Sequence, residues 1–108
     1  MPKEIRQQVY SKYSGHCGYC GREIEFKDMQ VDHVTAKRNG GTECNPSCRR
    51  CNHYKRAHSL EIFREMLKTL HQRVRDIYIC KVAEDYGIIE IKEWDSKFYF
   101  EKAGGEEK

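Results

Sequence analysis

The stretches Cys17-Gly-Tyr-Cys20 and Cys48-Arg-Arg-Cys51 are two Cys-x-x-Cys pairs in a chain of 108 residues, with 27 residues between them. Thiolates at positions i and i+3 of a tight turn can occupy one edge of a metal tetrahedron, and four cysteines form a standard closed zinc site. We therefore predict that the two pairs hold one structural Zn²⁺. Iron in the same site is the main alternative, and redox-active or free buried thiols are a weaker one.

Two cysteines lie outside these pairs. Cys44 is close enough in sequence to compete as a ligand, but Cys48 completes the i, i+3 spacing and is the better candidate. Cys80 is predicted to be a small buried hydrophobe.

The length of the chain fits one domain, which we place at residues 1–102, with a motif core at 17–58 and a disordered tail at 103–108. No segment is long and apolar enough to span a membrane, and the N-terminus lacks the apolar core of a signal peptide. We therefore expect a cytoplasmic protein. In that compartment thiols stay reduced, and cysteines at these spacings indicate metal rather than disulfides.

The hydrophobic patterns predict an α+β fold. A strand over Gln30–Val34 is expected to form a hairpin around a turn at Arg38–Gly41, and a helix over Cys48–His58 with Ser47 as its N-cap should follow. The other expected elements are helices at 3–14, at 59 to about 74 and at about 75–86, and a C-terminal β-hairpin of Ile88–Trp94 and Lys97–Glu101.

Three polar residues that suit a second site lie inside or beside the loop that the cysteines would close. Asp32 and His33 stand at the end of the expected strand, and Asn52 directly follows the last cysteine. Neighbours in a regular strand point to opposite faces, so Asp32 and His33 share a site only if the strand ends or bends there. An ordinary zinc ribbon needs none of these residues, which favours an enzyme.

This stretch resembles the HNH endonuclease family, which has a ββα-metal core. The matching residues are Cys17-x-x-Cys20, Val31-Asp32-His33, Gly40-Gly41 and Cys48-x-x-Cys51-Asn52-x-x-Lys55. The resemblance implies that His33 is a general base, which activates water to attack a phosphodiester. It also implies that Asp32 and Asn52 hold Mg²⁺ or Mn²⁺ by oxygen atoms. The implied substrate is DNA, cut or nicked to leave 5′-phosphate and 3′-hydroxyl ends.

Basic residues concentrate around the second cysteine pair, although the net charge of the whole chain is only +3. Such a run is either a solvated face or a nucleic-acid contact, and its overlap with the metal motif favours phosphate contacts. Lys55 is equally well explained as a support for the helix. The candidates for phosphate contacts are Lys37, Arg38, Arg49, Arg50, Lys55 and Arg56.

One departure from the family pattern concerns a middle asparagine about five residues before the second cysteine pair. This chain has Glu43 there, and its nearest asparagine is Asn45. Either Asn45 orients the catalytic histidine from a shifted position, or that brace is missing and catalysis is weak. Two alternatives to an endonuclease of phage or mobile-element origin therefore stay open. They are a zinc-stabilised nucleic-acid-binding module and a protein-interaction module that binds another nuclease or a host factor. A second copy of the chain or another protein is predicted as a further partner beside DNA.

Overall fold

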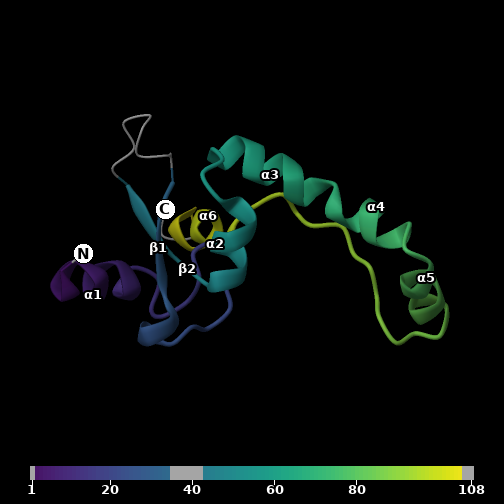
Figure 1. Ribbon diagram of the computed structural model, residues 1–108, viewed down its shortest axis with the longest axis horizontal. Coiled ribbons are helices and arrows are strands. Elements are labelled where there is room, and N and C mark those ends of the chain that lie inside the picture. The colour runs from purple at the N-terminus through teal and green to yellow at the C-terminus, as the bar shows by residue number, and fades with distance from the viewer. Residues whose placement is uncertain (1, 35–42, 106–108) are drawn as a thin grey trace. The chain divides into compact units, whose positions relative to one another are not determined.

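The computed structural model describes residues 2–34 and 43–105, which divide into two compact units. One unit combines Met1–Leu60 with Lys97–Lys108, and the other is Glu61–Ser96. The predicted α+β class is confirmed. Among the described residues, no helix has the length and apolar character that a membrane span requires. The elements in chain order are α1 (Lys3–Ser11), the 3₁₀ turn η1 (Phe26–Asp28), β1 (Gln30–His33), β2 (Cys44–Ser47), α2 (Arg49–Lys55), α3 (Leu60–Lys68), α4 (Leu70–Arg75), α5 (Tyr78–Asp85) and α6 (Tyr99–Gly105) (Figure 1).

The centre of the first unit is the antiparallel pair of β1 and β2, followed directly by α2. In its register Asp32 lies opposite Asn45, and His33 lies opposite Cys44. Since side chains alternate along a strand, Asp32 and Asn45 share one face of the hairpin and His33 lies on the other. The first face is buried, whereas His33 is half-buried. The predicted ββα arrangement is therefore present; the turn predicted at Arg38–Gly41 lies outside the described residues.

Helix α1 is tied by its own side chains to the segment that precedes β1. The guanidinium of Arg6 donates to the carbonyl oxygens of Phe26 (3.4 Å) and Met29 (3.2 Å). The hydroxyl of Tyr10 donates to the carbonyl of Ile24 at 2.8 Å. The helix is shorter than predicted, because the chain takes positive φ values just after it, including +82° at Gly15.

The C-terminal β-hairpin predicted at Ile88–Trp94 and Lys97–Glu101 is wrong. Residues 88–98 form no regular element, and α6 begins at Tyr99. The backbone N–H of Phe98 donates to Oε1 of Glu101 at 2.8 Å, which caps the start of the helix. The alternating pattern indicated strands, but this cap satisfies a free N–H at the start of α6 and so favours a helix there.

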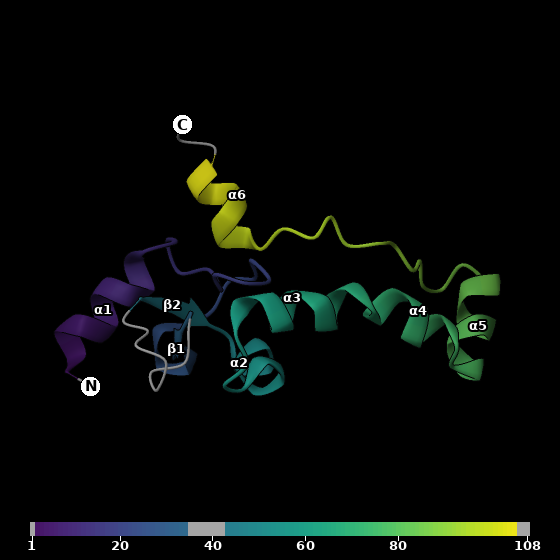
Figure 2. The ribbon, with the colours of Figure 1, turned by 90° about the horizontal axis from the view of Figure 1, so that it is seen from above.

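The same segment is bonded to the first cysteine pair. The N–H groups of Tyr99 and Phe100 donate to the carbonyl oxygens of Tyr19 (3.0 Å) and Gly18 (2.8 Å). A Cβ atom at Gly21 would lie only 2.8 Å from the ring of Tyr99, so glycine permits this close approach. Helix α6 and this turn therefore belong to one unit although they are far apart in sequence (Figure 2).

The second unit contains α4, α5 and most of α3. The single helix predicted from Ser59 to about Val74 is interrupted at Thr69, whose hydroxyl donates to the carbonyl of Met66 at 2.8 Å and competes with the helical bond. The helix predicted at about 75–86 is confirmed in α5, and Gly87 ends it with a φ of +74°.

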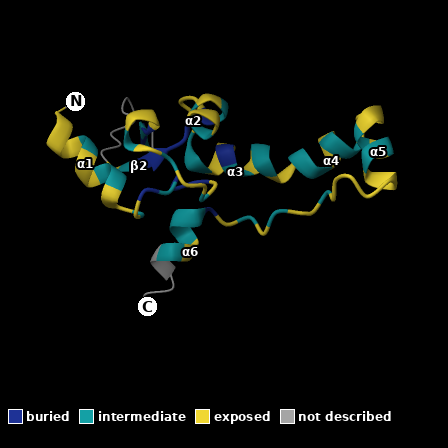
Figure 3. Cartoon of the chain, turned by 90° about the horizontal axis from the view of Figure 1, so that it is seen from below, coloured by how far each residue is buried: buried dark blue, intermediate teal, exposed yellow. Residues whose placement is uncertain are grey.

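The described residues have few buried apolar side chains. In the first unit these are Cys17, Tyr19, Met29, Pro46, Cys48 and Phe98. Figure 3 shows buried stretches of this unit close to β2 and α2. Because this core is small, a metal ion bound by the four cysteines would contribute a large share of the free energy of folding. That both units belong to one domain of residues 1–102 stays a prediction.

Candidate functional site

The four cysteines of the two predicted pairs form one cluster. The Sγ atoms of Cys17, Cys20, Cys48 and Cys51 all lie within 4.8 Å of one another. Two of them, on Cys20 and Cys48, are 3.9 Å apart. A tetrahedral zinc with bonds of about 2.3 Å requires sulfur atoms about 3.8 Å apart. The cluster can therefore hold a metal ion such as zinc, and its fourth member is Cys48, as predicted, rather than Cys44.

Backbone amides support two of these sulfur atoms. The N–H of Tyr19 donates to Sγ of Cys17, and the N–H of Cys51 donates to Sγ of Cys48, each at 3.4 Å. Cys48 is thereby the N-cap of α2, and the cap predicted at Ser47 is wrong because Ser47 is the last residue of β2. Donors aimed at sulfur favour the thiolate form, which is the form that binds metal.

The thiols also act on one another. Hydrogen bonds from Cys20 and then Cys51 hold the pKa of Cys17 far below its usual value. The same contact with Cys17 raises the pKa of Cys20 to about 11, and the pKa of Cys51 is raised further by Cys17 and Cys20. Negative charge therefore settles on Cys17 first. Metal binding must displace the protons of Cys20 and Cys51, so it weakens as the pH falls.

Asp32 is held by two donors on one of its oxygens. Tyr19 donates its hydroxyl to Oδ2 at 2.5 Å, and Nζ of Lys55 lies 3.2 Å from the same oxygen. Asp32 is 6% exposed and Lys55 is 1% exposed, so both charges of the pair are buried. Within the described residues, no hydrogen bond or ion pair engages Oδ1.

Tyr19 is the site residue that the sequence did not indicate. Burial, and then the hydrogen bond to Asp32, raise the pKa of Tyr19 well above its usual value. Its hydroxyl therefore stays protonated and acts as a donor. A tyrosine between two cysteines does not by itself indicate a role in a site, because its partner Asp32 lies 13 residues away in the sequence.

Lys55 ties α2 to the end of β1, since its ammonium also donates to the carbonyl of His33 at 3.1 Å. Asn52 lies three residues earlier on α2 and so shares the helix face of Lys55. Asn52 is therefore on the side of α2 that carries Lys55, whereas Asp32 and His33, at the end of β1, lie on opposite faces of the hairpin. Across the described residues, neither His33 nor Asn52 makes a side-chain hydrogen bond to Asp32.

Asn45 lies on the buried face of the hairpin and is 0% exposed. Its Oδ1 accepts from Nζ of Lys12 at 3.4 Å, and its Nδ2 has no hydrogen-bond partner in the part of the chain that the structure describes. Its opposite residue is Asp32. Asn45 thus shares a face with Asp32 and not with His33, the residue that the family's middle asparagine would orient.

The predicted phosphate contacts fall into three groups. Arg49, Arg50 and Arg56 are exposed on α2 and at its end. The described residues do not include Lys37 and Arg38. Lys55 is not placed for a phosphate contact, because its ammonium is buried against Asp32. This favours the helix-support role that the sequence left equally open.

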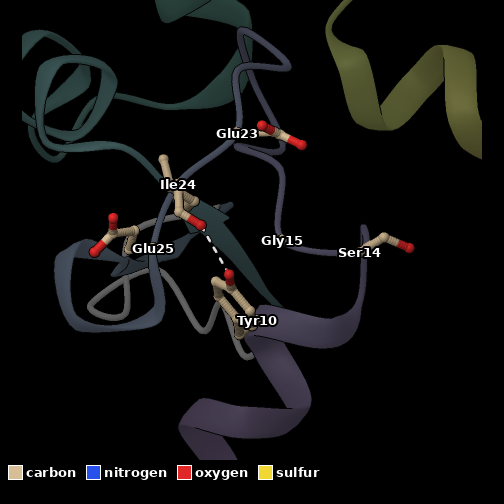
Figure 4. A pocket seen from close by; sticks show the side chains of 6 residues that line it. All are labelled: Tyr10, Ser14, Gly15, Glu23, Ile24 and Glu25. Atoms are coloured by element: carbon tan, nitrogen blue, oxygen red, sulfur yellow. Dashed lines mark hydrogen bonds between the residues drawn. The ribbon is translucent and has the colours of Figure 1, made fainter.

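A pocket of about 380 Å³ lies next to α1 in the first unit. Its acidic side chains do not suit phosphate, and in Figure 4 Glu23 and Glu25 point in different directions rather than converging. We assign it no role in the site. Its lining residues are Tyr10, Ser14, Gly15, Glu23, Ile24 and Glu25.

Comparison with known families agrees with this geometry. Residues 17–68 match the model of a family described as HNH endonuclease. The matched stretch contains the four clustered cysteines, the β1–β2 hairpin and α2. No curated protein and no solved structure matches the chain. Residues 17–68 of this chain belong to the HNH endonuclease family.

Proposed function

We propose that this chain is a metal-dependent DNA endonuclease or nickase, with zinc in the cysteine cluster and a divalent cation at Asp32 and Asn52. The observation that carries the proposal is the double contact of Lys55 with Oδ2 of Asp32 (3.2 Å) and the carbonyl of His33 (3.1 Å). It keeps α2, and with it Asn52, beside the end of β1. The family match supports a nuclease-type fold.

The donor set suits a small hard cation. Asp32 and Asn52 would offer one carboxylate oxygen and one amide oxygen, which fits Mg²⁺ or Mn²⁺ with water in the other positions. When bound, the cation would stabilise charge on the phosphate and on the departing oxygen. His33 would accept the proton of the attacking water, a role for which a neutral imidazole is suited.

His33→Ala is expected to abolish nicking of supercoiled plasmid in Mg²⁺ or Mn²⁺. A positioned general base contributes roughly 10²- to 10⁴-fold to rate, so the loss should be plain on a gel time course. The matched control is His53→Ala, which removes an exposed histidine of α2 and should nick at the wild-type rate. Equal nicking by wild type and His33→Ala would remove His33 from the proposed mechanism.

The double variant Arg49→Gln/Arg50→Gln is expected to bind DNA more weakly and with less dependence on salt. Both arginines are exposed in the first turn of α2. If each neutralises one phosphate, the slope of log K against log salt should fall by about 2 in magnitude. Fluorescence anisotropy over a salt series measures this. Lys27→Gln, a change at an exposed lysine next to Glu25, is the control, and an unchanged slope in the double variant would contradict the assignment.

A nucleic-acid-binding module with little catalysis is the second candidate, and the position of Asn45 favours it. Asn45 faces Asp32 across the hairpin, so the usual brace for His33 is not evident in the described residues. Retardation of plasmid by wild type without nicking would support this candidate. Neither retardation nor nicking would point to a protein-interaction module. A cytoplasmic location, a phage or mobile-element source and a second copy as partner stay predictions.

A further inference from the structure

Tyr19 contacts both candidate metal sites at once. Its backbone N–H donates to Sγ of Cys17 at 3.4 Å, and its side-chain hydroxyl donates to Oδ2 of Asp32 at 2.5 Å. The cysteine cluster and the candidate cation ligand are therefore joined through one residue.

The side chain of Tyr19 is held on several sides. It is 4% exposed, and its ring makes edge-to-face contacts with Phe98 (centroids 5.4 Å apart) and Phe100 (6.0 Å). Its carbonyl accepts the N–H of Tyr99 at 3.0 Å. A hydroxyl on a ring packed in this way has little freedom to move away from Asp32.

A carboxylate rotates less freely when two donors contact one of its oxygens than when a single donor does. The terminal torsion of aspartate is broad, so a single contact leaves the carboxylate plane free to rotate. In this site Tyr19 approaches Oδ2 from a rigid aromatic ring, and Lys55 approaches the same atom from α2. The lysine stem is flexible, so the directional constraint comes mainly from the tyrosine. Since both donors occupy Oδ2, Oδ1 is the oxygen that Asp32 can offer to a cation.

We propose that Tyr19 is a positioning residue that fixes the carboxylate of Asp32 for monodentate binding of the divalent cation. The inference rests on the proposed function, because it takes Asp32 as a cation ligand. Tyr19 touches neither substrate nor cation; it acts through Asp32. Residues that orient a metal ligand in this way typically contribute 10- to 100-fold to metal affinity.

The test is Mn²⁺ binding to the zinc-loaded full chain, followed by electron paramagnetic resonance. Tyr19→Phe removes only the hydroxyl and is expected to weaken Mn²⁺ binding roughly tenfold while zinc content is unchanged. Tyr10→Phe is the matched control, since it removes the hydroxyl of a half-buried tyrosine that donates to a backbone carbonyl at 2.8 Å in the same unit. It should bind Mn²⁺ as wild type does.

The outcomes separate this inference from the proposed function. If wild type binds no Mn²⁺, or Asp32→Asn binds it equally well, the proposed cation site is overturned. If wild type and Tyr19→Phe bind Mn²⁺ equally and Asp32→Asn does not, the positioning role is overturned and the proposed function stands.

A second measurement uses only the wild-type protein, so it does not require Tyr19→Phe to fold. In wild type labelled with ¹³C at the tyrosine Cζ atoms, titration with Mg²⁺ should shift the Tyr19 resonance and leave that of Tyr10 in place. Should Tyr19→Phe lose its zinc or fail to fold, this titration decides. A Tyr19 resonance that does not move as Mg²⁺ binds would overturn the inference.

Discussion

Cys48→Ser is expected to unfold the unit formed by residues 2–60 and 97–105 and to release its zinc. Cys48 supplies one sulfur of the four-thiol cluster and also caps α2 through the N–H of Cys51. Replacing its sulfur by a hydroxyl removes a soft ligand, and a three-sulfur set binds structural zinc much less well. The helix that carries Asn52 would lose its attachment at the same time.

The size of the effect follows from the small core of this unit. Zinc binding to structural sites contributes about 10 to 16 kcal/mol of apparent free energy in peptide systems at neutral pH. The whole free energy of unfolding of a typical domain is only about 5 to 15 kcal/mol. Loss of the metal therefore removes a share comparable with the entire stability. Thermal unfolding by circular dichroism, with zinc measured by mass spectrometry, tests this.

Cys44→Ser is the matched control for that variant. Cys44 lies in β2, close to the cluster in sequence but outside it. This variant should keep one zinc per chain and a melting temperature near that of wild type. A Cys48→Ser variant that keeps both its zinc and its melting temperature, or a Cys44→Ser variant that loses its zinc, would show that the cluster is assigned wrongly.

Features encoded in local spacing could be predicted from the sequence. Each cysteine pair follows from its own i, i+3 spacing, and strand β1 follows from the alternation of residues at Gln30–His33. These patterns need only neighbours within a few residues. The prediction that Cys48, rather than Cys44, joins the cluster was confirmed for the same reason.

Features that depend on distant partners could not be predicted. The bond from Tyr19 to Asp32 and the docking of the Tyr99 amide on the Tyr19 carbonyl join segments that no periodicity relates. The C-terminal segment alternates like a hairpin, yet it forms α6. One signal was available, since Glu101 stands three residues after Phe98 and caps its N–H.

Lys55→Met is expected to lower the free energy of unfolding by about 3 to 5 kcal/mol, because it leaves the buried carboxylate of Asp32 without its counter-charge. The two charged groups are 1% and 6% exposed and 3.2 Å apart, so little solvent screens their attraction. Urea unfolding in excess zinc measures the loss. Lys68→Met is the control: its ion pair with Glu65 at 3.4 Å is largely exposed and should contribute less than about 1 kcal/mol.

A double-mutant cycle separates loss of the pair from loss of packing. Asp32→Asn/Lys55→Met removes both charges, so it should recover much of the stability that Lys55→Met loses, with a coupling energy of about 1 to 3 kcal/mol. The same double variant should not recover Mn²⁺ binding, since Asp32 is the proposed ligand. A Lys55→Met variant within about 0.5 kcal/mol of wild type would mean that solvent reaches Asp32 after all. The contacts of Lys55 would then no longer explain how α2 is held beside the end of β1, and the proposed site would lose its main support.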